Sequence, residues 1–414
     1  MLKWCLGLFA LTAGVRLAYV LVVPQQESLL LDQAAYDALA ARILQGKPYV
    51  LVPGSGYANP IAPPFFTDTS SPSAVYPPGY PLFLAGIYKA FGQRYLPVRL
   101  IQAILWGLCA ITLFLIGETI GLRRVCSGLG AGLLALSPPH VELAGLLLSE
   151  NLFAPLLLLA VLFTVLAVKK GPWWAILAGV CSGFSGLTRP TGAGLIIALG
   201  IILLVFMRKH AIWPFFALIL FGFLILSPWA IRNQNALGWP VISSTAGGRA
   251  LYLTATGVPE GQEWDSIPGF LARKGIEPTT LHQSLNEAQL DRLYAEMARE
   301  AFLRDPIRAL SVMSLNPLRF AFNMPYPGTR PSGKTVAYAV FTGIVIALSF
   351  WGLIKNREPS LWAIALVFIY FALAHTVMSP ALVRYSLPVI PLLYPIALSG
   401  LIPKPKITPH QARP

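Results

Sequence analysis

The sequence predicts an all-α integral membrane protein. Of its 414 residues, 56% are hydrophobic and only 12% are charged, whereas soluble domains carry about 25% charged residues. The mean hydropathy is +0.65, and several uninterrupted apolar runs reach the ~20 residues that cross a hydrocarbon core. Most of the surface therefore does not face water, and the composition argues strongly against a soluble enzyme.

About ten apolar segments are predicted to be transmembrane helices, and residues 1–414 are predicted to form one domain. The segments are residues 4–24, 97–120, 126–138, 151–168, 173–188, 191–207, 211–230, 335–354, 360–377 and 385–402. Two of them are short and end at prolines, which is tolerated where protein or a water-filled cavity covers the helix ends. The first segment is too long for a signal peptide and has no clear cleavage site, so an uncleaved helix is expected.

Basic residues fall at every second connection between these segments. They are Arg123, Arg124, Lys169, Lys170, Arg208, Lys209, Lys355 and Arg357. The positive-inside rule makes these loops cytoplasmic, and Lys3 and Lys404 place both termini there. Of the 17 acidic residues, only Glu118 and Glu358 lie near that side. One face is thus a basic collar and the other holds nearly all the carboxylates.

Charge and metal-binding residue types exclude several other classes. A net charge of +14 would suggest a nucleic-acid partner in a soluble protein, but basic membrane loops explain it here, and no nucleic-acid partner is expected. The four cysteines lie in apolar runs without a C-x-x-C pair, so they are predicted to be small buried residues. The five histidines lack metal-ligand spacing. No cofactor is predicted, although a divalent metal remains open.

Two long outer segments remain, at about 25–96 and about 231–334. In the first, residues 31–45 have the spacing of an amphipathic helix on the membrane surface, and residues 80–91 form a second candidate. In the second, residues 306–322 could form an eleventh span. We reject that alternative because it would invert the later positive-inside pattern.

Few polar residues are available for chemistry, which makes each one informative. Asp32 begins the predicted surface helix and could act as a general base; the alternative is a helix N-cap. Glu150 begins the fourth span, where an acid also complements the helix dipole. His140 and Glu142 lie just upstream and either line the same cavity or meet lipid headgroups. Tyr36, one turn after Asp32, lines the cavity or anchors the helix at the interface.

Three arginines mark the outer ends of predicted spans: Arg189, Arg232 and Arg384. The planar guanidinium can grip a phosphate with two hydrogen bonds at once. Each arginine taken singly could instead extend toward lipid headgroups. Because all three lie at the same predicted depth, on the carboxylate side, a shared phosphate site is the hypothesis.

Several motifs together give a family resemblance. They are Asp32-Gln33-Ala34-Ala35-Tyr36, Tyr76-Pro77-Pro78-Gly79-Tyr80-Pro81, Leu148-Ser149-Glu150-Asn151, Leu187-Thr188-Arg189-Pro190, Pro228-Trp229-Ala230-Ile231-Arg232-Asn233, Ser243-Ser244-Thr245-Ala246-Gly247-Gly248 and Arg384-Tyr385-Ser386-Leu387-Pro388. In this order and spacing, the chain resembles bacterial membrane glycosyltransferases of the protein mannosyltransferase and aminoarabinose transferase-like family, which have the GT-C fold.

The resemblance implies inverting transfer of a sugar from a polyprenyl-phosphate donor to a lipid, glycan or protein acceptor. It implies a multi-pass protein of the bacterial cytoplasmic (inner) membrane with its active site on the outer face. An acid of the first outer loop, here Asp32, is the presumed base, and the acid opening the fourth span maps onto Glu150. Aminoarabinose transferase-like members carry a lysine where Tyr76 stands, and Gln33 replaces the second acid of the eukaryotic acidic pair.

The expected mechanism needs one base and cationic help for the leaving group. Asp32 takes the proton of an acceptor hydroxyl, which contributes about 10²–10⁴ in rate, while Arg384 and Arg232, with Arg189 third, stabilise charge on the departing phosphate. The rival hypothesis is a transporter or flippase of lipid-linked sugars. Transporters often show inverted repeats and sites near the bilayer midplane, whereas no repeat is found here.

Overall fold

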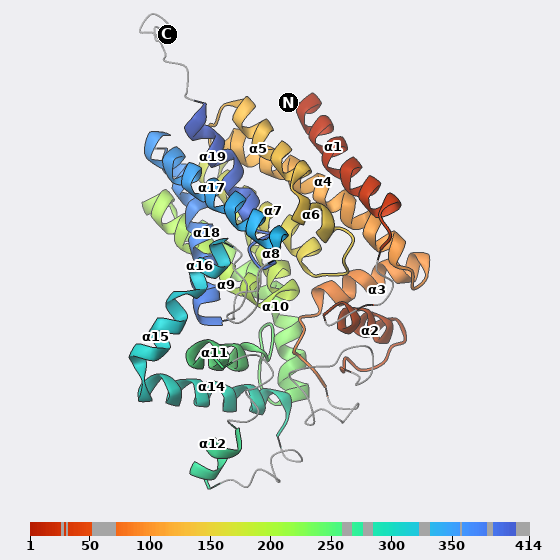
Figure 1. The fold of residues 1–414 in the computed structure, drawn as a ribbon, viewed down its shortest axis with the longest axis vertical. Helices are drawn as coiled ribbons and strands as arrows, with labels where there is room; N and C mark the ends of the chain where they lie inside the picture. Colours follow the sequence, from red (N-terminus) through yellow and green to blue (C-terminus); the bar gives the residue numbers. More distant parts are fainter. Residues whose placement is uncertain are drawn as a thin grey trace, which may run out of the picture.

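The computed structural model describes residues 1–25, 29, 32–51, 72–258, 267–275, 285–322, 332–356, 358–378 and 384–402. Within these ranges every regular element is a helix, and no strand occurs. The long helices pack side by side, while a group of shorter helices gathers at one end of the molecule (Figure 1). The predicted all-α class is confirmed.

Seven helices in the described part are long and apolar enough to cross a membrane. They are α1 (Leu2–Val22), α4 (Tyr95–Thr119), α7 (Glu150–Lys170), α9 (Pro190–Met207) with its 3-10 extension η1 (Arg208–His210), α10 (Ile212–Leu237), α17 (Gly333–Asn356) and α18 (Pro359–Met378). Each coincides with a predicted span.

Three shorter apolar helices occupy the remaining predicted spans. They are α5 (Arg124–Leu136), α8 (Trp174–Thr188) and the pair η3 (Ile390–Leu393) with α19 (Tyr394–Leu401). Helix α5 is followed directly by a short helix, α6 (Pro138–Leu143). The described part of the chain thus has apolar helices at all ten predicted places, seven of them at full spanning length.

Small residues allow these helices to approach one another closely, as in many membrane bundles. Helix α8 packs between α7 and α10, and α4 contacts α1, α5 and α7. At Gly179 a Cβ atom would lie only 2.4 Å from the carbonyl oxygen of Leu218. The contact between α8 and α10 therefore depends on a glycine at this position.

Ion pairs join the connections that the charge pattern assigns to the same side. Lys169 at the end of α7 contacts Glu358 before α18, with Nζ and Oε1 3.2 Å apart. On the other side, Lys334 near the start of α17 contacts Glu142 of α6 at 3.0 Å. The basic collar therefore lies at one end of the helical bundle, and the face with most of the carboxylates lies at the other end.

The first outer segment contains two packed helices rather than one loop. They are α2 (Asp32–Leu44) and α3 (Gly79–Phe91), at the places predicted for amphipathic helices. Their apolar faces share one core that includes Leu39, Tyr80 and Leu84. Helix α2 is therefore covered by α3 and by the turn before α7, where Leu147 joins the same core.

Most of the second outer segment forms a small helical unit at the end of the molecule opposite the start of α1 (Figure 1). The unit contains α11 (Gly247–Thr256), α12 (Ile267–Arg273), α14 (Glu287–Arg304) and α15 (Pro306–Ser314), and the next helix, α16 (Asn316–Phe322), packs against α17 and α18 of the bundle. Helices α15 and α16 have 9 and 7 residues, far below the ~20 that a span needs. Residues 306–322 therefore do not form one continuous eleventh span.

Candidate active site

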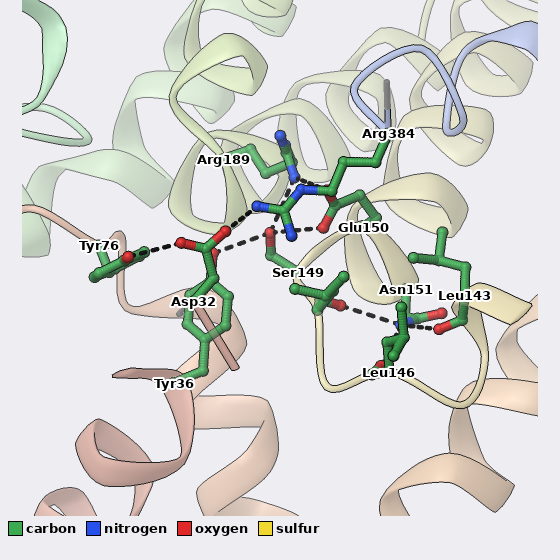
Figure 2. A network of polar contacts seen from close by, with 11 residues as sticks. Asp32, Tyr36, Tyr76, Leu143, Leu146, Ser149, Glu150, Asn151, Arg189 and Arg384 are labelled. Atoms are coloured by element: carbon green, nitrogen blue, oxygen red, sulfur yellow. Dashed lines mark hydrogen bonds and ion pairs between the residues drawn. The ribbon is translucent and has the colours of Figure 1, made fainter. Parts of the chain in front are cut away.

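Four charged side chains from distant parts of the sequence meet beside the start of α7 (Figure 2). Asp32 begins α2, Glu150 begins α7, Arg189 stands between α8 and α9, and Arg384 precedes η3. We call these four residues the polar cluster. All four belong to the set that the sequence singled out.

Glu150 is the centre of the polar cluster. Its Oε1 lies 2.7 Å from Nη1 of Arg189 and 3.4 Å from Nε of Arg384. Arg384 also forms an ion pair with Asp32 through Nη2 and Oδ2. The Glu150 side chain is only 1% exposed, while those of Asp32 and Arg384 are 25% and 29% exposed. Glu150 thus anchors the two guanidinium groups, and Asp32 remains accessible.

The turn before α7 is fixed by side-chain hydrogen bonds to the backbone. The Asn151 amide donates to the carbonyls of Leu143 and Leu146 at 3.0 and 2.9 Å. The side-chain oxygen of Gln33 accepts from the backbone N–H of Leu147 at 3.0 Å. Because Gln33 and Asn151 each neighbour a carboxylate of the polar cluster, these bonds set where Asp32 and Glu150 meet.

Hydroxyl groups complete the network. Tyr76 donates to Oδ1 of Asp32 at 2.8 Å. Tyr36 donates to Oγ of Ser149 at 3.1 Å, and Nη1 of Arg189 donates to the same oxygen at 3.2 Å. Tyr36 is buried, at 6% exposure, so it is part of the network rather than an anchor at the membrane surface.

The site residues Tyr76 and Ser149 were not singled out from the sequence. Both stand inside motifs of the family resemblance, one directly before Pro77 and one directly before Glu150. Their position next to Pro77 and Glu150 was the feature of the sequence that could have indicated them.

The segment that carries Tyr76 approaches the α8–α9 junction closely at Gly79. A Cβ atom at this position would lie only 2.7 Å from the carbonyl oxygen of Leu187, so the approach requires glycine.

The carboxylates of the polar cluster stabilise the charged form of Arg384. Burial alone lowers the pKa of Arg384, but the carboxylates of Glu150 and Asp32 outweigh it and hold that pKa well above its usual value. Two guanidinium groups and two carboxylates leave the polar cluster without net formal charge. An anion can bind here by sharing or replacing the carboxylate partners of the arginines.

Arg232 does not join the polar cluster, which corrects the expectation of a shared three-arginine site. Its Nη1 donates to the carbonyl of Ser73 at 2.8 Å, and its Nη2 donates to that of Tyr49 at 3.1 Å. The guanidinium also lies over the Trp229 ring, 4.9 Å from its centroid. Arg232 therefore binds the backbone of the first outer segment.

His140 is likewise a packed residue rather than a cavity residue. It is fully buried, with Nδ1 2.7 Å from Oγ of Ser137 and Nε2 2.8 Å from the carbonyl oxygen of Leu387. Burial lowers its pKa to about 3, so the ring is neutral. Because a carbonyl only accepts, Nε2 carries the proton and donates to it. Glu142 lies at the surface in its ion pair with Lys334.

Within the part of the chain that the structure describes, no group of three or more His, Cys, Asp or Glu side chains could hold a metal ion. Asp32 and Glu150 are each engaged by Arg384. The divalent metal left open by the sequence gains no ligand set from these residues.

One known protein family matches part of the chain. Residues 75–231 match the dolichyl-phosphate-mannose-protein mannosyltransferase family, a stretch that includes Tyr76, Glu150 and Arg189. No curated protein sequence matches the chain.

Two solved membrane enzymes resemble the chain in structure. An oligosaccharyltransferase from Archaeoglobus fulgidus in its apo form has a TM-score of 0.59 at 15% identity, with 96% of this chain and 50% of that chain covered. This chain thus spans half the length of that enzyme. ArnT from Cupriavidus metallidurans bound to undecaprenyl phosphate has a TM-score of 0.43 at 15% identity, with 95% and 76% covered.

The helical bundle, the fold-level likeness and the family match agree with the resemblance carried by the sequence motifs. The chain is an all-α, multi-pass membrane protein with the GT-C fold of membrane glycosyltransferases.

Proposed function

We propose that this protein transfers a sugar, with inversion, from a polyprenyl-phosphate donor to an acceptor hydroxyl at the outer face of the bacterial cytoplasmic membrane. The observation that carries the proposal is the polar cluster: an accessible carboxylate and two guanidinium groups that share one buried glutamate. The family match over residues 75–231 supports glycosyl transfer as the reaction class.

Asp32 is the general base of the proposed reaction. The acceptor oxygen forms a bond to the anomeric carbon while its proton passes to the Asp32 carboxylate. The bond between the anomeric carbon and the phosphate oxygen breaks, and polyprenyl phosphate leaves with that electron pair. Help of this kind is worth about 10²–10⁴ in rate. The side chain is a quarter exposed, so an acceptor can reach it from solvent.

The arginines serve the leaving group. Polyprenyl phosphate leaves readily, so no protonated carboxylic acid is needed to expel it, unlike in glycoside hydrolysis. Arg384 and Arg189 donate to the phosphate as its negative charge grows. Glu150 holds both guanidinium groups in place, so their position costs little reorganisation during the reaction.

The location suits a substrate with a lipid tail. Glu150 and Arg189 stand at the starts of α7 and α9, at the ends opposite the basic collar. The tail can stay in the bilayer while a polar acceptor arrives from water: a lipid headgroup, a glycan or a protein. A transporter would place its charged site near the midplane, and no observation in the described structure favours that alternative.

The test uses the purified full-length chain in lipid nanodiscs with an undecaprenyl-phosphate-linked sugar and a panel of hydroxyl acceptors. We expect release of undecaprenyl phosphate, measured by mass spectrometry, and a product whose anomeric configuration by NMR is opposite to that of the donor. Three results contradict the proposal: a bound donor that is never cleaved, a product with retained configuration, or movement of intact donor between leaflets.

A further inference from the structure

Residues 73–76 belong to the first outer segment, and they are hydrogen-bonded both to another part of that segment, at Tyr49, and to the second outer segment. Four of their backbone groups are bonded to residues of the second outer segment or of α10. The bonds run from Arg232 Nη1 to the Ser73 carbonyl, from the Ala74 N–H to Glu287 Oε1, from the Thr245 N–H to the Ala74 carbonyl, and from Ser244 Oγ to the Val75 carbonyl. We call this set of contacts the clamp.

Glu287 is the buried acid of the clamp. It is the first residue of α14 and is 5% exposed. Its carboxylate accepts from the Ala74 N–H at 2.7 Å and from the Thr245 hydroxyl. Burial raises the pKa of Glu287, and these hydrogen bonds oppose the rise. A buried acid bonded to backbone N–H groups fixes the chain that carries those groups.

The carbonyl side of the segment is fixed as firmly. Arg232 Nη1 lies 2.8 Å from the Ser73 oxygen, and Ser244 Oγ lies 2.6 Å from the Val75 oxygen. Tyr49 adds a bond from its hydroxyl to the Tyr76 carbonyl at 3.0 Å. Backbone N–H and carbonyl groups of residues 73–76 are therefore both hydrogen-bonded, and the last of these residues, Tyr76, is the one whose side chain contacts Asp32.

Tyr76 ends the clamped segment, and its hydroxyl lies 2.8 Å from Oδ1 of Asp32. The other carboxylate oxygen of Asp32 pairs with Arg384. When a donor phosphate draws Arg384 away from Asp32, the Tyr76 hydrogen bond still orients that carboxylate. A base must be held in a defined direction to accept a proton during attack.

We propose that Tyr76 is a positioning residue for Asp32, and that Glu287 and Arg232 place it from the second outer segment and α10 by clamping residues 73–76. The role of Tyr76 in turnover rests on the proposed function of Asp32 as the base. The clamp itself does not depend on that function.

The first experiment replaces the hydroxyl only, in Tyr76→Phe. We expect kcat to fall about two- to tenfold, the effect of one hydrogen bond, with the dissociation constant for the donor unchanged. The acid side of the kcat–pH profile moves to higher pH, because the ionised carboxylate loses a donor. The charged and titratable groups around Asp32 are Arg384, Glu150, Arg189, Tyr36, Tyr76 and Tyr385.

Tyr88→Phe is the matched control. The Tyr88 hydroxyl donates to Oδ1 of Asp37 at 2.6 Å, so this variant removes a bond between a tyrosine and an α2 aspartate of the same kind, away from the polar cluster. It should leave the pH profile in place. A Tyr76→Phe enzyme with wild-type kcat and pH profile, or an equal shift in Tyr88→Phe, overturns the positioning role.

The second experiment tests the clamp through Glu287. Glu287→Gln keeps an acceptor oxygen and should retain activity, whereas Glu287→Ala should show the lowered kcat and the pH shift of Tyr76→Phe. Because both act through one contact, the double variant Glu287→Ala with Tyr76→Phe should lose little more than either single variant. Fully multiplicative losses overturn the connection.

Two readouts without turnover separate failure of this inference from failure of the proposed function. Glu287→Ala should speed amide hydrogen exchange at residues 73–76, and Glu287→Gln should not. Labelling of Asp32 by a carbodiimide, which reacts with protonated carboxyls, should extend to higher pH in Tyr76→Phe than in Tyr88→Phe. Both results can be obtained from a protein that transfers no sugar, and unchanged exchange together with unchanged labelling overturns the inference.

Discussion

The polar cluster and the clamp are built from similar parts but bind different partners. Each has a buried glutamate at the start of a long helix, Glu150 on α7 and Glu287 on α14. Each also contains arginine, and a neighbouring hydroxyl donates to one of its carboxylates. In the polar cluster, Arg384 faces side-chain carboxylates. In the clamp, Arg232 faces backbone carbonyls.

The difference shows which arginine can serve a ligand. Backbone carbonyls cannot move without moving the chain, so an arginine bonded to them maintains a loop conformation. An ion pair between side chains can exchange for a phosphate of similar charge. The clamp therefore holds the outer segments together, and the polar cluster is left to do chemistry.

The largest stability effect should follow the loss of the glutamate shared in the polar cluster. Glu150→Gln leaves two guanidinium groups without their common carboxylate in a buried setting, which typically costs about 3–5 kcal/mol. Apparent thermal unfolding of the full chain in detergent measures it. Glu142→Gln removes an exposed ion pair and should leave unfolding unchanged. Equal effects of the two variants would contradict the role of Glu150 as the anchor.

The clamp region should respond to pH through Asp291 of α14. This carboxylate accepts from the Gly248 N–H at 2.6 Å, and burial raises its pKa to about 7. An unfolded aspartate has a pKa of about 3.9, so between these values the folded protein holds a proton that the unfolded chain releases. This contribution to stability is full below about pH 4 and is lost as pH rises through about 7, on the order of 2–4 kcal/mol.

Asp291→Asn checks that sign. It keeps an acceptor oxygen and cannot ionise, so the variant should gain stability over the wild type as pH rises from about 4 to 7. The difference between the two unfolding temperatures, followed across that range, is the measurement. A difference that stays constant, or that reverses, would contradict the buried acid.

A smaller effect separates the two arginines in ligand binding. Arg384→Gln should weaken undecaprenyl phosphate binding about 10- to 100-fold, because charge-assisted hydrogen bonds are worth about 1.5–3 kcal/mol. Arg232→Gln should change the affinity little, because Arg232 donates to the Ser73 and Tyr49 carbonyls and to the Asn233 side chain. Titration of the lipid phosphate by native mass spectrometry compares them. A larger loss in Arg232→Gln would reverse the assignment.

The sequence predicted the elements that depend on local pattern. The length of the apolar runs predicted the ten apolar helices, and the helical spacing of apolar residues predicted α2. Both patterns are local, because they reflect burial against lipid or against one core. Four of the residues proposed for the site meet in the structure: Asp32 and Glu150 begin helices, Arg189 stands between two helices, and Arg384 lies in the turn before η3.

The remainder depends on contacts between distant residues. Arg232 and Arg384 look alike in sequence, since both follow apolar stretches, and only the fold shows that Arg232 meets the first outer segment at Ser73. Glu287 resembles an ordinary acid in the first turn of a charged helix, and its burial against Ala74 is set by another part of the chain. For the same reason His140 could not be recognised as a packed residue.

The central claim, that Asp32 removes the acceptor proton, is tested most directly by Asp32→Asn in the full-length chain. We predict that kcat falls about 10²–10⁴-fold, while the affinity for the polyprenyl-phosphate sugar does not fall, because Arg384 is freed for the phosphate. Asp37→Asn, on the same helix and bonded to Tyr88, is the control and should keep its turnover. Undiminished turnover in Asp32→Asn would contradict the account.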